Sequence, residues 1–126
     1  MKLNLSIVKG GFTIHRFSSD AKIPMEILQE SFYSISKTED ELSVVCESSV
    51  KLMSDSCEND WSCIKVLGPL DFALTGILAD ISALLAQAEI SIFAISTFDT
   101  DYILVKTNQL EKSKQALEIG EYNFID

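Results

Sequence analysis

The feature that most constrains the fold is the stretch of residues 61–106, which contains the one sustained helical pattern of the sequence. Apolar residues recur there at steps of three and four, as on one face of a helix. They are Leu74, Ile77, Leu78, Ile81, Leu84, Leu85 and Ala88. Apolar segments typical of strands flank this stripe at 62–67, 90–96 and 101–105. A helix with a single apolar face needs a partner layer, so these strands are expected to form a sheet beneath it.

Composition and charge exclude several classes of protein. The 126 residues carry a net charge of −9, which both halves share, and no basic tract interrupts it. Such a chain does not suit binding to nucleic acid or to an anionic membrane. No apolar run reaches the roughly 18 residues of a membrane span, and the N-terminal segment is too short and polar for a secretory signal. Three cysteines cannot all pair, so reduced thiols in a cytoplasmic protein are expected.

The first half of the chain is expected to be rich in strands. Residues 3–8 and 12–17 alternate apolar and polar side chains, and Gly10-Gly11 between them predicts a hairpin turn. Residues 54–60 contain no apolar side chain except a cysteine, which predicts a link between the two halves.

Capping residues and short sequence patterns predict the remaining helices and strands. The main helix is expected to begin between Phe72 and Gly76, with Asp71 or Thr75 as its capping residue. The other expected elements are a helical turn from Pro24 to about Glu30, strands at 32–37 and 42–46, a second helix from about Asn108 to Ile119 that stops at Gly120, and a short edge strand near the C-terminus.

The two halves resemble one another. The sequence of residues 31–45 matches that of residues 91–105 without a gap, at a displacement of 60. The predicted order of strand, turn and strand also coincides. This match predicts a duplication in which the first copy has exchanged its long helix for a hairpin and a short helix. The expected fold class is therefore α+β, with two small units, 1–58 and 59–126, each a sheet with helices on one face.

No set of residues typical of catalysis is visible. His15 is the sole histidine, and neither a phosphate-binding glycine loop nor a metal-ligand motif occurs, so no metal and no cofactor are expected. Asp99 and Asp101 form a carboxylate pair on a predicted turn, where a solvated turn is the ordinary interpretation. A small enzyme that uses one of them as a base remains an alternative, but the chain is expected not to be an enzyme.

The strongest functional signal is geometric. The junction GPLDFALTGI and the segment STFDTD both follow the ends of apolar strands. Backbone amides near Gly76 and the positive end of the helix suit a carboxylate. Ser96 and Thr97 offer hydroxyl groups and Asp101 offers an anion, so the two ends together suit a zwitterion. In the alternative interpretation, Gly76 only permits close packing of helix and sheet, and Asp101 only closes its own turn.

Residues 61–117 resemble an ACT domain, a small ligand-binding βαββαβ module of amino-acid metabolism. The segments LTGIL, ISTF and TDYILV within residues 71–105 carry the resemblance. It is closest to the subgroup of CASTOR-type arginine sensors and of short bacterial proteins with two ACT-like units. The resemblance implies two tandem ferredoxin-like units with antiparallel sheets, of which residues 1–58 form a degenerate one. One departure is Ala88-Glu89, at a turn where ACT domains usually have glycine.

The resemblance also implies a ligand site between units. The residues that it assigns are Asp71, Leu74, Thr75, Gly76, Ile77, Thr97, Phe98 and Asp101. Asp101 would bind the cationic group of an amino acid, the backbone near Gly76 its carboxylate, and Phe98 would cover its aliphatic part. In the first unit Lys37-Thr38 stands where the second has Thr97-Phe98, which implies that the equivalent site is altered or lost.

The implied function is a regulatory module that binds an amino acid and acts as a homodimer on a regulated protein partner. The alternative is an interaction protein of the same fold that binds no ligand.

Overall fold

The structure is a computed structural model, and it describes residues 3–68 and 75–125. The chain divides into two compact units. The helical unit comprises residues 1–9 and 62–126, and the hairpin unit comprises residues 10–61. Two strands, β1 (Asn4–Phe17) and β4 (Ser56–Val66), contribute residues to both units. Whether two ACT-like domains meet near residue 58 stays a prediction.

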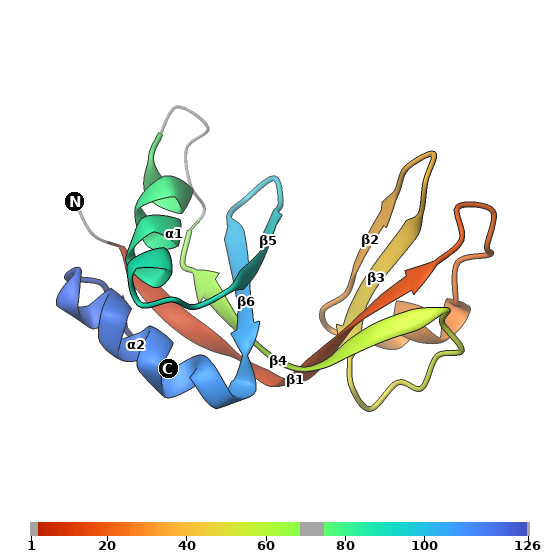
Figure 1. The fold of residues 1–126 in the computed structure, drawn as a ribbon, viewed down its shortest axis with the longest axis horizontal. Coiled ribbons are helices and arrows are strands. Elements are labelled where there is room, and N and C mark those ends of the chain that lie inside the picture. The colour runs from red at the N-terminus through yellow and green to blue at the C-terminus, as the bar shows by residue number, and fades with distance from the viewer. Residues whose placement is uncertain (1–2, 69–74, 126) are drawn as a thin grey trace. The chain divides into compact units, whose positions relative to one another are not determined.

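The helical unit has the predicted βαββαβ order in residues 62–124 (Figure 1). After β4 its elements are α1 (Ile77–Gln87), β5 (Ile92–Ser96), β6 (Asp101–Lys106), the 3₁₀ turn η2 (Thr107–Gln109), α2 (Leu110–Ile119) and β7 (Asn123–Phe124). The strand order is β7-β1-β4-β6-β5, with β5 and β6 antiparallel and β7 parallel to β1. The start of the chain therefore lies between the first and last strands of the βαββαβ set.

One apolar core joins the sheet of this unit to both helices. Alternate strand residues enter the core, among them Ile64 and Val66 of β4 and Ile103 and Val105 of β6. The helices contribute Ile81, Leu85 and Leu117. Since residues from both helices share one cluster with one set of strand positions, α1 and α2 cover the same face of the sheet. The predicted α+β class is confirmed.

The hairpin unit is a smaller sheet with a short covering layer. Its elements are the second part of β1, the 3₁₀ turn η1 (Met25–Gln29), β2 (Ser34–Lys37), β3 (Leu42–Glu47) and the first part of β4. The strand order is β2-β3-β1-β4, and β3 is antiparallel to both β1 and β2. Ile27 of η1 packs in a cluster with Leu42, Val44 and Cys46 of β3, so η1 closes one face.

Two predictions about the first half are wrong. Residues 4–17 form one continuous strand rather than a hairpin, because Gly10 adopts a φ of +101° inside the strand instead of starting a turn. Residues 56–60 belong to β4 rather than to a linker. This polar segment forms a strand because it pairs with β1 at the edge of the hairpin unit, where its side chains can remain exposed. Asn59 there accepts a hydrogen bond from Thr13 Oγ1 at 3.3 Å.

The two hairpins correspond at a displacement of 59 residues. Lys37 pairs with Leu42 in the first hairpin, and Ser96 pairs with Asp101 in the second. The predicted displacement of 60 is therefore wrong by one residue at these hairpins, because it superimposes acidic turn residues instead of the paired ends of the strands. A slip by one residue exchanges the two faces of a strand, so the correct displacement decides which side chains are equivalent. The duplication itself stays a prediction.

The ends of both helices differ from the simplest expectation. Gly76 is the N-cap of α1, and no side chain of the described residues caps the helix, so the expected cap at Thr75 is wrong. Asp71 lies outside the described residues. Gly120 follows α2 as predicted, but with a φ of −78°. A Cβ atom there would lie 2.4 Å from Leu84 Cδ1, so a larger residue at this position would require the side chain of Leu84 to move.

The turn after α1 generates a prediction about stability. Glu89 has a φ of +61°, a left-handed conformation that costs most side chains roughly 1–2 kcal/mol and glycine little. Glu89→Gly should therefore raise the free energy of unfolding by about 0.5–1 kcal/mol in urea denaturation. Gln115→Gly on the exposed side of α2 is the control and should lower it by about 1 kcal/mol. Destabilisation by both variants would contradict the account.

His15 generates a prediction about pH. Its side chain is 5% exposed, its Nδ1 lies 2.8 Å from Ser54 Oγ, and its Nε2 has no hydrogen-bond partner among the described residues. Burial lowers the pKa of His15 below 6.5. The unfolded chain then binds the proton more readily, so the free energy of unfolding should fall as the pH drops below 6.5.

The sole histidine gives an unambiguous NMR titration, and its midpoint should lie below 6.5. His15→Gln should remove this component of the pH dependence of urea denaturation. A midpoint at or above 6.5 would contradict the prediction.

Candidate functional site

The candidate site lies at the end of the helical unit where β4 stops and β5 turns into β6 (Figure 1). Thr100 is the residue that joins these two places. Its side chain is 4% exposed, and its Oγ1 donates a hydrogen bond of 2.5 Å to the carbonyl oxygen of Val66. The turn is thereby held against the end of β4.

The turn itself is closed by hydrogen bonds between its first and last residues. The N–H and the Oγ1 of Thr97 both donate to the carbonyl oxygen of Thr100, at 2.8 and 3.0 Å. The N–H of Thr100 donates in return to Thr97 Oγ1 at 3.2 Å. These bonds fix the backbone on both sides of Phe98 and Asp99, so the side chains at the tip project from a defined frame.

A pocket of about 170 Å³ opens beside this turn. Its lining residues are Lys65, Gly68, Thr97, Asp99, Thr100 and Tyr102. Lys65 and Tyr102 alternate along their strands with the core residues Ile64, Val66 and Ile103. Because successive side chains of a strand point to opposite faces, Lys65 and Tyr102 lie on the face of the sheet that the helices do not cover.

Two opposite charges line the pocket without pairing. The Nζ of Lys65 lies 5.9 Å from the ring centroid of Tyr102, within the range of a cation–π contact. Within the described part of the chain, neither the Lys65 ammonium nor the Asp99 carboxylate makes an ion pair. The pocket therefore presents one unpaired cation and one unpaired anion.

The start of α1 holds three of the site residues that the sequence predicts. Thr75 and Gly76 are exposed, and Ile77 is the first helical residue. Gly76 has a φ of +83°, and a Cβ atom there would meet none of the described residues within 4 Å. The glycine is therefore favoured by its backbone conformation, and the alternative that it serves close packing is wrong. Asp71 and Leu74 lie outside the described residues.

The remaining predicted residues lie on the β5–β6 turn. Thr97 lines the pocket, whereas Phe98 and Asp101 do not. Asp101 Oδ1 accepts a hydrogen bond of 2.5 Å from Ser96 Oγ, and the side chain of Phe98 is 79% exposed. Figure 1 places the start of α1 and this turn at the same end of the unit. The ligand-binding roles of these residues stay predictions.

A carboxylate of the protein already lies near the start of α1. The hydroxyl of Tyr122, a residue 5% exposed, donates a 2.6 Å hydrogen bond to Asp80 Oδ2 in the first turn of the helix. Burial, and then the hydrogen bond with Asp80, raise the pKa of Tyr122. Asp80 interacts favourably with the positive end of the helix dipole and weakens its attraction for a further anion. The start of α1 therefore already has a carboxylate of the protein beside it, whereas Lys65 has none among the described residues.

Sequence reasoning missed Lys65 and Tyr102. Each has a polar end group and alternates with apolar residues along a predicted strand. Residues on a solvent-exposed face of a sheet show the same pattern. Their position near the ends of neighbouring strands was the available signal. No cluster of three or more potential metal-ligating side chains occurs among the residues that the structure describes.

A family model for the ACT domain matches residues 56–118. The chain belongs to the ACT domain family. The ACT match covers the whole of β4, α1, β5 and β6 and all of α2 except its last residue. A second model, described as the N-terminal domain of another family, matches residues 10–50 in the hairpin unit.

Solved structures resemble this ACT protein over nearly all of its length. A protein of Agrobacterium tumefaciens is 36% identical with a TM-score of 0.91, and the match covers 99% of this chain and 93% of that one. A putative C-terminal regulatory domain of aspartate kinase from Porphyromonas gingivalis is 20% identical with a TM-score of 0.58, over 90% of this chain and 94% of that one.

Aspartate kinase of Clostridium acetobutylicum, an allosteric enzyme, is 17% identical with a TM-score of 0.65, over 86% of this chain and 32% of the enzyme. Both kinase similarities show a shared fold. No curated protein sequence matches the ACT chain. In the described ranges, no helix has the length and apolar character that crossing a membrane requires.

The buried hydroxyl of Thr100 generates a prediction. Thr100→Val keeps the shape of the side chain but leaves the carbonyl oxygen of Val66 without its donor. The free energy of unfolding should fall by about 1–3 kcal/mol in urea denaturation. Thr97→Val, at the exposed end of the same turn, is the control and should cost less. Equal effects of the two variants would contradict the proposed tie between the turn and β4.

Proposed function

We propose that this ACT protein is a regulatory module that binds a free amino acid in its helical unit and catalyses no reaction. The observation that carries the proposal is the pocket at the β5–β6 turn, which contains the predicted residue Thr97. It lies at the strand ends where the sequence places a zwitterion site. The fold shared with a regulatory domain of aspartate kinase supports a regulatory role.

The size of the pocket supports a small ligand. Pockets for drug-sized molecules measure roughly 300–1,000 Å³, whereas this one measures about 170 Å³. A free amino acid fits this scale better than a nucleotide or a peptide. We propose that a second copy of the chain completes the walls in a cytoplasmic homodimer.

The contacts that the sequence predicts are a second arrangement for the same ligand. In that arrangement Gly76 with its neighbours at the start of α1 and Asp101 on the turn would bind the ligand, and Phe98 would cover its aliphatic part. Binding across the dimer would stabilise one arrangement of the subunits, and a regulated protein would bind that arrangement preferentially.

One observation favours a second function, that of an interaction module without a ligand. β5 is the last strand in the hydrogen-bonded order of the described residues, and its sequence IFAIS carries no charge. Such an edge can pair with a strand of another chain. The two functions differ in whether an amino acid binds.

A thermal-shift screen against each standard L-amino acid at several millimolar separates the two functions. A ligand at 100 times its dissociation constant adds roughly 2.7 kcal/mol, which is several degrees in Tm. The regulatory proposal predicts a shift by one amino acid or a few related ones, confirmed by isothermal titration calorimetry. A folded protein that responds to none of them would contradict it and favour the interaction module.

A further inference from the structure

We propose that the pocket recognises the two charged groups common to all free α-amino acids, Lys65 binding the carboxylate and Asp99 the ammonium group. We further infer that Arg16 occupies the equivalent position of the hairpin unit, so that each chain binds one amino acid. This inference rests on the proposed function and specifies which residues of the chain perform it.

Lys65 has the environment of a carboxylate-binding group. Its neighbours along β4, Ile64 and Val66, are fully buried, so the strand at this point is anchored in the core. The ring of Tyr102 supports the ammonium group on one side. No carboxylate among the described residues neutralises it, which leaves its charge to the pocket. An ammonium group that is positioned but unpaired can bind an incoming carboxylate with a charge-assisted hydrogen bond.

Asp99 supplies the complementary charge. It lies within the turn that the hydrogen bonds between Thr97 and Thr100 close, so its backbone is held in place. Its carboxylate has no ion-pair partner in the described residues and lines the same pocket as Lys65. Because the two charges do not pair with each other, both are available to a ligand that carries one charge of each sign.

The hairpin unit contains a turn with the same hydrogen bonds, between β2 and β3. At the displacement of 59 residues, Thr38 corresponds to Thr97 and Glu41 to Thr100. The N–H of Thr38 donates to the carbonyl oxygen of Glu41 at 2.9 Å, and the N–H of Glu41 donates to Thr38 Oγ1 at 3.2 Å. Both turns thus share one hydrogen-bond pattern.

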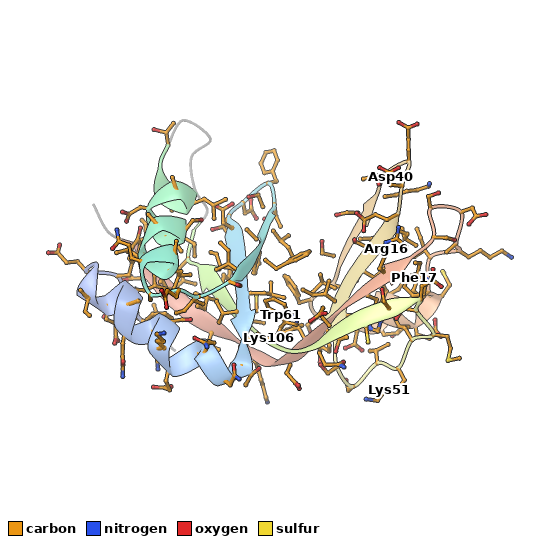
Figure 2. All side chains as sticks on the ribbon, in the orientation of Figure 1. Arg16, Phe17, Asp40, Lys51, Trp61 and Lys106 are labelled. Carbon is orange, nitrogen blue, oxygen red and sulfur yellow. The ribbon has the colours of Figure 1, made fainter. Side chains whose placement is uncertain are left out.

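The difference lies in the basic residue of the neighbouring strand. Arg16 near the end of β1 pairs with Ser43 at the start of β3, and Lys65 near the end of β4 lies beside Tyr102 at the start of β6. Figure 2 labels Arg16 and Asp40, which approach each other below the tip of the turn. Arg16 Nη2 donates to the carbonyl oxygen of Asp40 at 3.1 Å, and its Nε lies 3.9 Å from Glu41 Oε1. The turn itself therefore binds this cation.

The residue at the end of the turn accounts for this difference. Glu41 offers a carboxylate to Arg16, whereas the corresponding Thr100 uses its hydroxyl on Val66 and offers no charge to Lys65. The hairpin unit therefore neutralises its cation internally, and the helical unit leaves its cation to a ligand. A single site for each chain follows.

Isothermal titration calorimetry with the whole 126-residue chain tests the inference. Each standard L-amino acid is titrated singly, and every one that binds is titrated again as its primary amide, which lacks the carboxylate charge. Lys65→Gln and Asp99→Asn should each weaken binding of the free amino acid by roughly tenfold to a hundredfold. The wild type should bind the amide at least tenfold more weakly than the acid, whereas Lys65→Gln should bind both alike.

Charge-matched controls come from the exposed surface of α2. Lys112→Gln and Glu111→Gln make the same charge changes far from the pocket lining and should leave the affinity within twofold of the wild type. Asp101→Asn separates the present inference from the sequence prediction, because it should weaken binding less than Asp99→Asn does. The fitted stoichiometry should be one amino acid for each chain.

The possible failures differ from one another. If the wild type binds no amino acid, the proposed function is wrong and this inference falls with it. If the wild type binds one and Lys65→Gln binds it equally well, the function stands and the inference is overturned. A stoichiometry of two for each chain, or loss of binding in Asp101→Asn but not in Asp99→Asn, also overturns it.

Discussion

The structure of the helical unit depends on the burial of alternate strand residues under two helices. Ile64 and Val66 of β4 and Ile103 and Val105 of β6 enter a core that also contains residues of α1 and α2. This burial anchors the register of the strands, because a shift by one residue would place polar side chains in the core. It also determines where the intervening residues point. Lys65 is held on the opposite face by the same packing that stabilises the fold, so the position of its charge does not depend on a flexible loop.

The hydrogen bond from Thr100 to Val66 holds the β5–β6 turn against the end of β4, where the turn forms one wall of the pocket. Both hairpins of the protein close their turns through a threonine at the first position, Thr38 or Thr97. In the helical unit the last residue of the turn, Thr100, bonds to the end of β4, while in the hairpin unit Glu41 faces Arg16. The same backbone turn is thus found in two settings. In the hairpin unit the neighbouring cation, Arg16, pairs with Glu41 of the turn, and in the helical unit Lys65 and Asp99 line a pocket without pairing. The two turns differ in the side chain at this equivalent position, Glu41 or Thr100, and in the basic residue beside it, Arg16 or Lys65.

Much of the fold could be predicted because it follows from local periodicity. The apolar stripe of α1, both hairpins, α2 and the last strand all have patterns confined to their own residues. The continuous strand β1 could not be predicted, since a glycine pair inside a strand and a glycine pair in a hairpin turn look alike in sequence. Only the pairing of the strand with its neighbours distinguishes the two. The polar start of β4 was missed for a similar reason, because edge pairing rather than burial makes it a strand. Of the candidate site, the turn with Thr97 was found from its position after an apolar strand. Lys65 and Tyr102 were not found, since only the pairing of distant strands brings them together.

We propose that the turn between β5 and β6 and Lys65 together form the amino-acid site. A crystal structure of the protein grown with an amino acid that stabilises it would locate the ligand. We expect electron density for one amino acid for each chain, with its carboxylate within hydrogen-bond distance of Lys65 Nζ and its ammonium group beside Asp99. Density at the start of α1 with the ammonium group on Asp101, or beside Arg16 in the hairpin unit, would contradict it.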